Sequence, residues 1–403
     1  MHPTVTTGHR PYPDQLASSG SSALDRWALG RIQALVEPAP IRFQLWDGFE
    51  LRPEGDPVAT IDFRNRRALY AWIWDADLQF GETYMSGAVD IRGDLDALLD
   101  LIYRRTRAPG AWRRWQRPNT PAAARTNVHR HYDLGNDFYR LWLDPELVYT
   151  CAYYPTPDAS LEEAQRAKMD LVCRKLRLAP GERVVEAGCG WGALALHMAR
   201  HYGVTVQAFN ISSEQIAFAR ERARAEHLDG RVAFIEGDYR DVSGRHDVFV
   251  SVGMLEHVGL AEFDAFSRVL GRALEADGRA LLHFIGRDRP APLNPWIQKR
   301  IFPGAYPPTL QEVCGRILEP ANLSVLDVEN LRLHYALTLR HWRARFEASA
   351  DRVRAMFDEP FVRAWRLYLA GSRAAFATGW MQLFQVVVSR ASSNAIPWTR
   401  RGA

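Results

Sequence analysis

The chain has 403 residues, which is enough for two domains that each bury a core of their own. Hydrophobic residues make up 47% and charged residues 24%, as in an ordinary soluble globular protein. The net charge of +4 is too small to indicate nucleic-acid binding, and we expect no nucleic-acid partner. The four cysteines show no paired metal spacing, which predicts free thiols in a reducing cytoplasm and no metal site. No apolar run approaches the roughly 18 residues that span a bilayer, so we expect a soluble protein that at most sits on a membrane surface.

The first part of the chain predicts a small α+β domain. Residues 1–20 are rich in Pro, Thr, Ser and Gly without any period, and we expect them to be disordered. An N-terminal domain is predicted over 21–104. Its expected elements are helices at 23–36 and 95–103 and strands at 41–46, 58–63 and 88–91.

A basic tract separates this domain from the rest of the chain. Residues 105–126 are rich in arginine and contain Pro109-Gly110, Pro118 and Pro121, which predicts a linker. Trp112 and Trp115 stand among its arginines. The pattern is typical of a solvated connector and equally of a patch for anionic lipid, while RNA binding fits it less well.

From about residue 127 strands alternate with helices, which predicts a mostly parallel sheet with helices on both faces. One expected strand ends at Glu186, and the others cover 204–209, 232–235, 248–252, 279–284, 324–331 and 383–388. The expected helices cover 160–177, 193–201, 213–227, 262–275, 336–357 and 359–378.

A glycine turn follows the first of these strands, at Gly188, Gly190 and Gly192. Such a turn lets the backbone approach a ligand closely and lets the next helix pack on the strand. Glu186 stands two positions before the first glycine. A carboxylate there would repel a pyrophosphate but suits a cationic amino-acid ligand, which favours S-adenosylmethionine over NAD.

Polar residues also follow the next two strands. Asn210 and Gln215 come after the second strand, and Asp238 and Tyr239 come after the third. Simpler interpretations exist: Ser212 caps a helix with Gln215 closing a capping box, and Asp238 is a helix cap or part of an exposed turn. Because the carboxyl ends of parallel strands share one edge, the three strand ends together predict a cofactor site.

Glu256 follows the fourth strand, where a catalytic group reaches over the sheet edge. His283 ends the fifth strand. From the residues alone, His283 is more typical of a satisfied core histidine and Cys151 of a small buried hydrophobe.

Residues 127–390 closely resemble the cyclopropane fatty acid synthases. The motifs that carry the resemblance are HYDLGNDFYRLWLDP (131–145), YTCAYY (149–154), VVEAGCGWG (184–192), DYRD (238–241), SVGMLEHVG (251–259), HFIG (283–286), IFPGAYPP (301–308) and HYALTLRHW (334–342). The resemblance implies an α/β class I S-adenosylmethionine-dependent methyltransferase over 127–403, Rossmann-like with a seven-stranded mostly parallel sheet. It also implies that the N-terminal unit is the extra domain of the phospholipid-acting branch.

The resemblance implies two sets of site residues and bicarbonate as a second cofactor. The cofactor would be held by Tyr149, Thr150, Glu186, Gly188, Gly190, Asn210, Ile211, Gln215, Asp238 and Tyr239. Bicarbonate would be held by Cys151, Glu256, His283, Ile285 and Tyr335, with Cys151 and Ile285 acting mainly through their backbone. Apolar walls around the substrate would come from Phe284, Trp296, Phe302, Tyr306 and Phe384.

The implied reaction is attack of a cis alkene on the sulfonium methyl, followed by proton removal by bicarbonate and closure of a cyclopropane ring. We expect the acyl chains of phospholipids as substrate, a peripheral location at an anionic inner membrane, and a homodimer. A methyl-branched or methylated unsaturated product is the alternative within the family. A methyltransferase for a soluble small molecule and a non-catalytic lipid-binding protein are the alternatives of other classes.

Overall fold

The computed structural model describes residues 20–105 and 134–396, and the chain forms two compact units, Met1–Asp94 and Leu95–Ala403. The stretch 1–19 and the linker predicted at 105–126, apart from residue 105, lie outside the described residues. Among the helices in the described part of the chain, none is long and apolar enough to cross a membrane.

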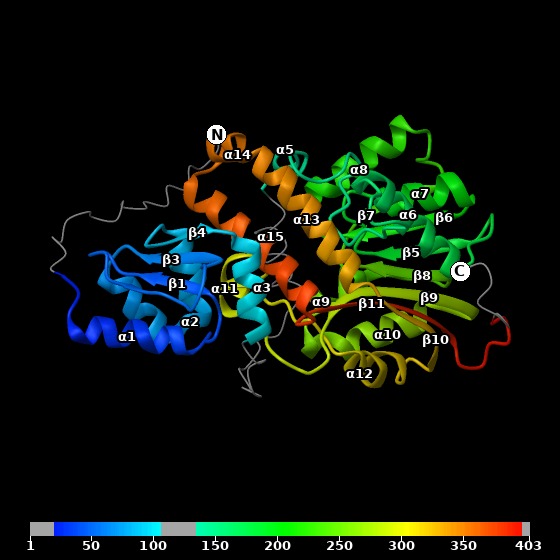
Figure 1. The fold of residues 1–403 in the computed structure, drawn as a ribbon. Coiled ribbons are helices and arrows are strands. Elements are labelled where there is room, and N and C mark those ends of the chain that lie inside the picture. Colours follow the sequence, from blue (N-terminus) through cyan, green and yellow to red (C-terminus); the bar gives the residue numbers. More distant parts are fainter. Residues whose placement is uncertain (1–19, 106–133, 397–403) are drawn as a thin grey trace. The chain divides into compact units, whose positions relative to one another are not determined.

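The first unit is a four-stranded sheet with two helices (Figure 1). It consists of α1 Ala23–Ala34, β1 Ile41–Gln44, β2 Glu50–Leu51, β3 Ala59–Phe63, α2 Arg66–Met85 and β4 Val89–Gly93. The strand order is β2-β1-β3-β4, with β1 parallel to β3 and the other pairs antiparallel. The helix and the strands predicted for this region are confirmed.

The sequence analysis missed helix α2. Asn65 begins it, accepting a hydrogen bond from the backbone N–H of Ala68 at 2.9 Å. The apolar residues of α2 do not follow one helical stripe, since Trp74 is 90% exposed and the backbone of Asp75 leaves the helical region with φ −155°. A period of 3.6 residues is the signal that reveals a helix from sequence, and this helix lacks it.

The second unit contains a seven-stranded sheet in the order β10-β11-β9-β8-β5-β6-β7 (Figure 1). Its strands are β5 Arg183–Ala187, β6 Thr205–Asn210, β7 Val232–Glu236, β8 His246–Val252, β9 Leu274–Gly286, β10 Leu323–Asn330 and β11 Gln382–Arg390. All pairs are parallel except those of β11, which runs antiparallel to both β9 and β10. The predicted Rossmann-like class I fold is therefore confirmed.

Helices cover both faces of this sheet, as its alternating pattern predicts. On one face lie α6 Leu161–Lys175, α7 Ala193–Tyr202 and α8 Ser213–Ala225. On the other lie α9 Leu255–Val258, α10 Phe263–Ala273, α12 Leu310–Val313 and the π-helical turn η3 Cys314–Leu318. Ser160 and Glu163 form the predicted capping box at the start of α6. The remaining short elements are α5 Asn136–Tyr139, η1 Tyr239–Asp241, η2 Leu260–Glu262 and α11 Pro295–Arg300.

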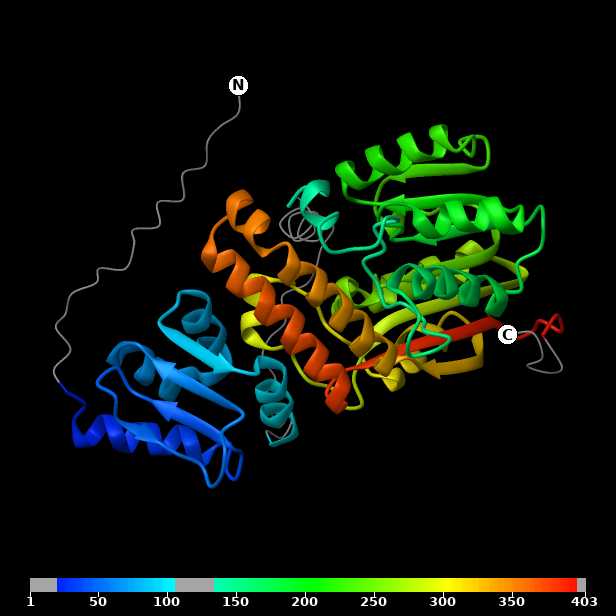
Figure 2. The ribbon, with the colours of Figure 1, turned by 45° about the horizontal axis from the view of Figure 1, so that its top comes forward.

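Two long helices, α13 Arg332–Ala348 and α15 Glu359–Thr378, lie side by side (Figure 2). The helix predicted at 336–357 is divided into α13 and α14 Ala350–Met356, because Ser349 leaves the helical region and its hydroxyl donates to the carbonyl of Leu141 at 3.2 Å. Helix α3 Leu95–Arg105, predicted as the end of the N-terminal domain, belongs to the second unit. Its Asp96 and Asp100 accept from Arg373 of α15 at 3.1 and 2.7 Å.

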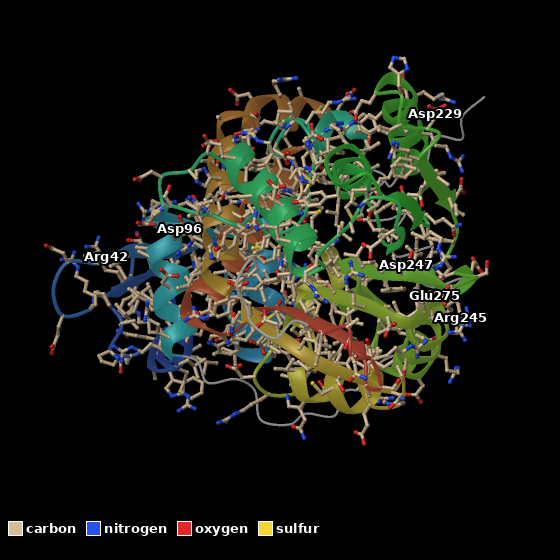
Figure 3. The ribbon with its side chains drawn as sticks, turned by 90° about the vertical axis from the view of Figure 1, so that its right-hand side faces the viewer. Arg42, Asp96, Asp229, Arg245, Asp247 and Glu275 are labelled. Carbon is tan, nitrogen blue, oxygen red and sulfur yellow. The ribbon has the colours of Figure 1, made fainter. Side chains whose placement is uncertain are left out.

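The two ends of the parallel strands differ in character. At the amino ends, Arg183 pairs with Asp247 at 3.4 Å and with Glu275 at 2.8 Å, and Figure 3 shows Asp247, Glu275 and Arg245 grouped at this edge of the sheet. These groups are partly exposed, and such surface pairs contribute little to stability. At the carboxyl ends the sheet instead opens into cavities.

Candidate functional site

Two cavities lie at the carboxyl ends of the strands, and they share a wall. The larger has a volume of about 160 Å³ and is lined by all ten residues predicted to hold a cofactor. The smaller, of about 30 Å³, is lined by all five residues predicted to hold bicarbonate. Four residues line both: Tyr149, Thr150, Gly253 and His257. A group bound in one cavity therefore lies next to a group bound in the other.

The glycine turn after β5 forms one side of the larger cavity. Gly192 has φ +84°, and a Cβ added there would lie 2.5 Å from the ring of Phe234, so a side chain would push α7 away from the sheet. Gly190 has φ +54° and nothing within 4 Å of an added Cβ, which leaves its backbone open toward the cavity. The turn therefore serves both roles expected of it, close packing and an open backbone.

Asn210 joins this turn to the start of α8. Its amide nitrogen donates to the carbonyl of Gly190 at 3.2 Å and to Oε1 of Gln215 at 2.6 Å. Ser212 caps α8 by accepting from the backbone N–H of Gln215, but the Gln215 side chain turns toward Asn210 instead of closing a capping box. The buried Nε2 of Gln215 has no partner among the described residues, so it is a donor available to a ligand.

Asp238 is a helix cap that also lines the larger cavity. Its carboxylate accepts from the backbone N–H of Arg240 at 2.9 Å and pairs with the Arg240 guanidinium at 2.8 Å. Tyr239 lines the cavity, but its ring packs edge-on against Phe266 in the core, 5.4 Å between centroids, and Arg240 lies over it at 4.6 Å. The contacts of Tyr239 are thus mainly those of a core residue.

Glu186 and Lys168 are two buried charged residues in the wall of the larger cavity. Glu186 is 2% exposed, and no hydrogen-bond partner of its Oε2 is found in residues 20–105 and 134–396. Burial raises the pKa of Glu186 to about 7, although the nearby Lys168 opposes the shift. Lys168, on α6, donates to the Thr150 hydroxyl at 3.1 Å, and burial lowers its pKa to about 8. The sequence analysis did not single out Lys168, because it stands mid-helix with no motif around it.

We expect Glu186→Gln to stabilise the ligand-free protein at neutral pH but not in acid. Between the ordinary pKa of 4.5 and the folded value of about 7, the unfolded chain loses a proton that the folded chain retains. The free energy of unfolding therefore falls as pH rises through this window, by at most about 3 kcal/mol, and glutamine escapes the penalty. Urea unfolding at about pH 5 and about pH 8 measures the difference. Glu221→Gln, on the exposed surface of α8, is the control, and an equal gain for both variants would contradict the prediction.

Glu256 and His283 bring two unsatisfied polar atoms to the smaller cavity. Glu256, on α9, is 5% exposed, and burial raises its pKa to about 7 against hydrogen bonds from its own backbone and from that of Ile285. Within the part of the chain that the structure describes, its Oε2 has no hydrogen-bond partner. His283 is 2% exposed, and its Nδ1 lies 3.0 Å from the amide nitrogen of Gln385. None of the described residues is a hydrogen-bond partner of its Nε2. Buried polar atoms are rarely left unsatisfied, so these two indicate a ligand.

The other three residues predicted for the bicarbonate ion complete the wall of the smaller cavity. Cys151 is fully buried and its Sγ contacts the carbonyl of Ala152 at 3.1 Å, while burial raises the pKa of the thiol. Tyr335 comes from α13 and packs on Phe376, 4.6 Å between ring centroids. Ile285 lies two residues after His283 in β9, so the two side chains are on the same face of the strand.

Four of the five predicted substrate-lining residues line neither cavity. Phe284 and Phe384 are paired across β9 and β11, and side chains alternate along a strand, so they face away from His283 and into the opposite core. Tyr306 packs in the same core, and Trp296 on α11 is buried outside both cavities. Phe302 alone lines the smaller cavity. The prediction selected aromatic residues near the motifs without fixing which face of the sheet they occupy.

Besides Lys168, the residues of the cavity walls that were not predicted include His257, Tyr368 and Leu383. His257 lines both cavities, and burial lowers its pKa to about 4. Tyr368 and Leu383 line the smaller cavity, and the Tyr368 hydroxyl lies 2.8 Å from that of Tyr149. His257 directly follows Glu256, so its place was readable from the motif, whereas Tyr368 comes from a helix that only the fold brings near.

The sequence of the chain is similar to those of known proteins. A family model described as mycolic acid cyclopropane synthetase matches residues 119–386, and one described as a domain of unknown function (DUF7884) matches residues 32–109. The chain is 37% identical over 381 residues to a probable fatty acid methyltransferase of Pseudomonas putida, covering 90% of this chain and 95% of that one. It is 41% identical over 267 residues to the cyclopropane-fatty-acyl-phospholipid synthase of Escherichia coli (strain K12), covering 66% and 68%.

A solved structure shows the same fold. The crystal structure of mycolic acid cyclopropane synthase CmaA1 complexed with SAH and CTAB matches with a TM-score of 0.63 and 32% sequence identity. The match covers 66% of this chain and 98% of that one. The residues matched by the family model, 119–386, lie in the unit that contains the cavities.

Proposed function

This chain belongs to the mycolic acid cyclopropane synthetase family, and on that premise we propose that it converts the cis double bond of an unsaturated phospholipid acyl chain into a cyclopropane ring. The methyl donor of this family is S-adenosylmethionine. The observation that carries the proposal is the pair of cavities with a common wall, the smaller of which contains two buried polar atoms without partners.

The larger cavity fits S-adenosylmethionine by its chemistry. The cofactor carries an ammonium group, a sulfonium, a ribose and an adenine, and it supplies an electrophilic methyl group when bound. Glu186 offers a buried carboxylate oxygen without a partner for a cationic group, and Gln215 offers a buried amide donor. Asp238 keeps acceptor capacity beyond its contacts with Arg240. Glu186 lies near the end of β5, Gln215 in the first turn of α8 after β6, and Asp238 just after β7, and all three line the larger cavity.

The smaller cavity fits bicarbonate. A volume of about 10–15 Å³ on the same measure holds one water, so about 30 Å³ has room for a small ion. Bicarbonate has one O–H donor and several acceptor lone pairs, which complement the carboxylate of Glu256 and a ring N–H of His283. Held there, it would supply a weak base beside the reacting carbons.

Residues of the protein exclude water from the smaller cavity and provide a group there that can take up a proton. Phe302, Tyr335 and Tyr368 line the smaller cavity with aromatic rings, which exclude water that would trap a positive charge on the acyl chain. Glu256 accepts or holds a proton at Oε2, and its raised pKa of about 7 places this change near physiological pH.

We further propose that the enzyme meets its substrate at an anionic membrane surface, where two copies work as a homodimer. Each helix of the first unit exposes a tryptophan: Trp27 on α1 is 60% exposed and Trp74 on α2 is 90% exposed, with Leu24 and Ile73 beside them. Tryptophan side chains are favoured at the boundary between lipid and water, which supports contact with a membrane surface.

The test is turnover of a phospholipid in vesicles. We expect the full chain, given S-adenosylmethionine with a labelled methyl group and bicarbonate, to add one CH₂ to oleoyl chains with loss of the alkene proton signals. Vesicles containing phosphatidylglycerol should react faster than purely zwitterionic ones, because anionic lipid attracts basic segments. Mass spectrometry and proton NMR of the released acyl esters give the product.

Each other product identifies a different function. Gain of CH₂ with a retained alkene indicates a methylated unsaturated chain, and gain of CH₄ indicates a methyl-branched chain whose formation also requires a hydride donor. Turnover of a soluble acceptor without vesicles would indicate a small-molecule methyltransferase. Lipid binding without any label transfer would indicate a non-catalytic lipid-binding protein.

A further inference from the structure

Behind the smaller cavity, three residues from three elements form a continuous hydrogen-bonded chain. Lys175, the last residue of α6, donates to Oε1 of Gln385 on β11 at 2.8 Å. The amide nitrogen of Gln385 lies 3.0 Å from Nδ1 of His283 on β9. Gln385 and His283 are direct partners in the antiparallel ladder of β9 and β11, and Gln385 is completely buried.

The chemistry of lysine fixes the orientation of every group in this chain. An ammonium can only donate, so the Gln385 atom beside Nζ must be its oxygen and the atom beside the imidazole must be its NH₂. An amide NH₂ can only donate as well, so Nδ1 of His283 must accept. The ring proton is therefore on Nε2, which is buried without a partner in a residue that lines the smaller cavity.

The surroundings keep this arrangement in place. Lys175 is anchored on its other side by Glu329 at 2.5 Å and lies 3.8 Å from Asp327, both on β10. Burial, with the charges of Lys168 and Lys175, lowers the pKa of His283 to about 3, so the imidazole remains neutral. A neutral imidazole has one donor nitrogen and one acceptor nitrogen. The hydrogen bonds from Lys175 through Gln385 determine which of the two faces the cavity.

We propose that Lys175 and Gln385 are positioning residues that hold His283 in the Nε2–H tautomer, so that the ring presents a hydrogen-bond donor to the anion in the smaller cavity. This inference rests on the proposed function, because bicarbonate is the anion of the proposed reaction. In the other tautomer the lone pair of Nε2 would face the anion and repel it. Lys175 and Gln385 therefore affect how tightly the anion binds, although neither of them contacts it.

The test is Gln385→Glu, which changes one NH₂ to oxygen at nearly constant shape. The new carboxylate still pairs with Lys175 but now accepts from Nδ1–H, which moves the ring proton away from Nε2. We expect ¹⁵N NMR of labelled histidine to show an Nε2–H tautomer in the native protein and an Nδ1–H tautomer in the variant, with the His283 signals assigned from His283→Asn. The bicarbonate concentration needed for half-maximal turnover should rise about tenfold or more.

Controls separate this effect from damage to the fold. Gln207→Glu makes the same chemical change at an exposed position of β6 and should alter neither the tautomer nor the bicarbonate requirement. Lys175→Met releases the amide to rotate and should give a mixture of tautomers with an intermediate bicarbonate requirement. Calorimetric binding of S-adenosylmethionine should be unchanged in Gln385→Glu, since Gln385 does not line the larger cavity.

The NMR measurement stands apart from the enzymatic one. An Nδ1–H tautomer in the native protein would overturn the positioning role even if the enzyme makes cyclopropanes. A tautomer that changes in Gln385→Glu while the bicarbonate requirement does not would overturn the donor role of His283. Absence of lipid turnover in the native protein would overturn the proposed function and leave the tautomer result readable.

Discussion

Replacement of Glu256 by glutamine is expected to reduce cyclopropane formation by about 10²-fold or more, the usual cost of impaired proton transfer, because bicarbonate, the proposed base, would lose the carboxylate that holds it. The amide has nearly the same shape, but it can neither carry negative charge nor accept a proton at Oε2, an atom for which the described part of the chain offers no hydrogen-bond partner. Steady-state turnover of oleoyl phospholipid vesicles measures the loss. Binding of S-adenosylmethionine should change by less than about threefold, since Glu256 lines only the smaller cavity.

The pH dependence of the native enzyme provides a second reading of the same residue. Because burial raises the pKa of Glu256 to about 7, the carboxylate becomes protonated as pH falls through 7, and turnover should fall with it. The residual turnover of Glu256→Gln should lack this step, whereas Glu221→Gln on the exposed surface of α8 should retain both the rate and the step. Turnover of Glu256→Gln within a few-fold of the native rate would remove the smaller cavity from the mechanism.

The sequence predicted the strands of the second sheet well because each strand has a local signal in the sequence. The alternation of apolar runs with capped helices predicted six of the seven strands as separate stretches, and the glycine turn marked the end of the remaining one, β5. Since the carboxyl ends of parallel strands meet, placing Glu186, Asn210 and Asp238 at strand ends was enough to place them around one cavity.

Residues that reach the site from far along the chain were not predictable in this way. Lys168 and Tyr368 stand in mid-helix, and only the packing of their helices brings them to the cavities. Phe284 and Phe384 line neither cavity for a related reason: they neighbour site residues in the sequence, but a strand sends successive side chains to opposite faces. Proximity along the chain was a good guide in the turns and a poor one in the strands.

Trp142→Ala is expected to lower the free energy of unfolding by about 3 kcal/mol, at the lower end of the cost of deleting a buried aromatic side chain. Trp142 is fully buried in an aromatic cluster, with ring centroids 5.2 Å from Tyr149 and 5.6 Å from Trp342. Its buried Nε1 has no partner, so the substitution also removes an unsatisfied donor, which offsets part of the lost packing. Urea unfolding followed by circular dichroism measures the change.

The same substitution should weaken the site, because Tyr149 lines both cavities and rests edge-on against the Trp142 ring. We expect the affinity for S-adenosylmethionine to fall in Trp142→Ala and to recover largely in Trp142→Phe, which restores most of the contact. Trp74→Ala, at a position 90% exposed, is the matched control and should change stability by less than about 0.5 kcal/mol. Equal stability losses for the two tryptophans would contradict the stabilising role of the aromatic cluster. An unchanged affinity in Trp142→Ala would show that the cluster does not support the wall that the two cavities share.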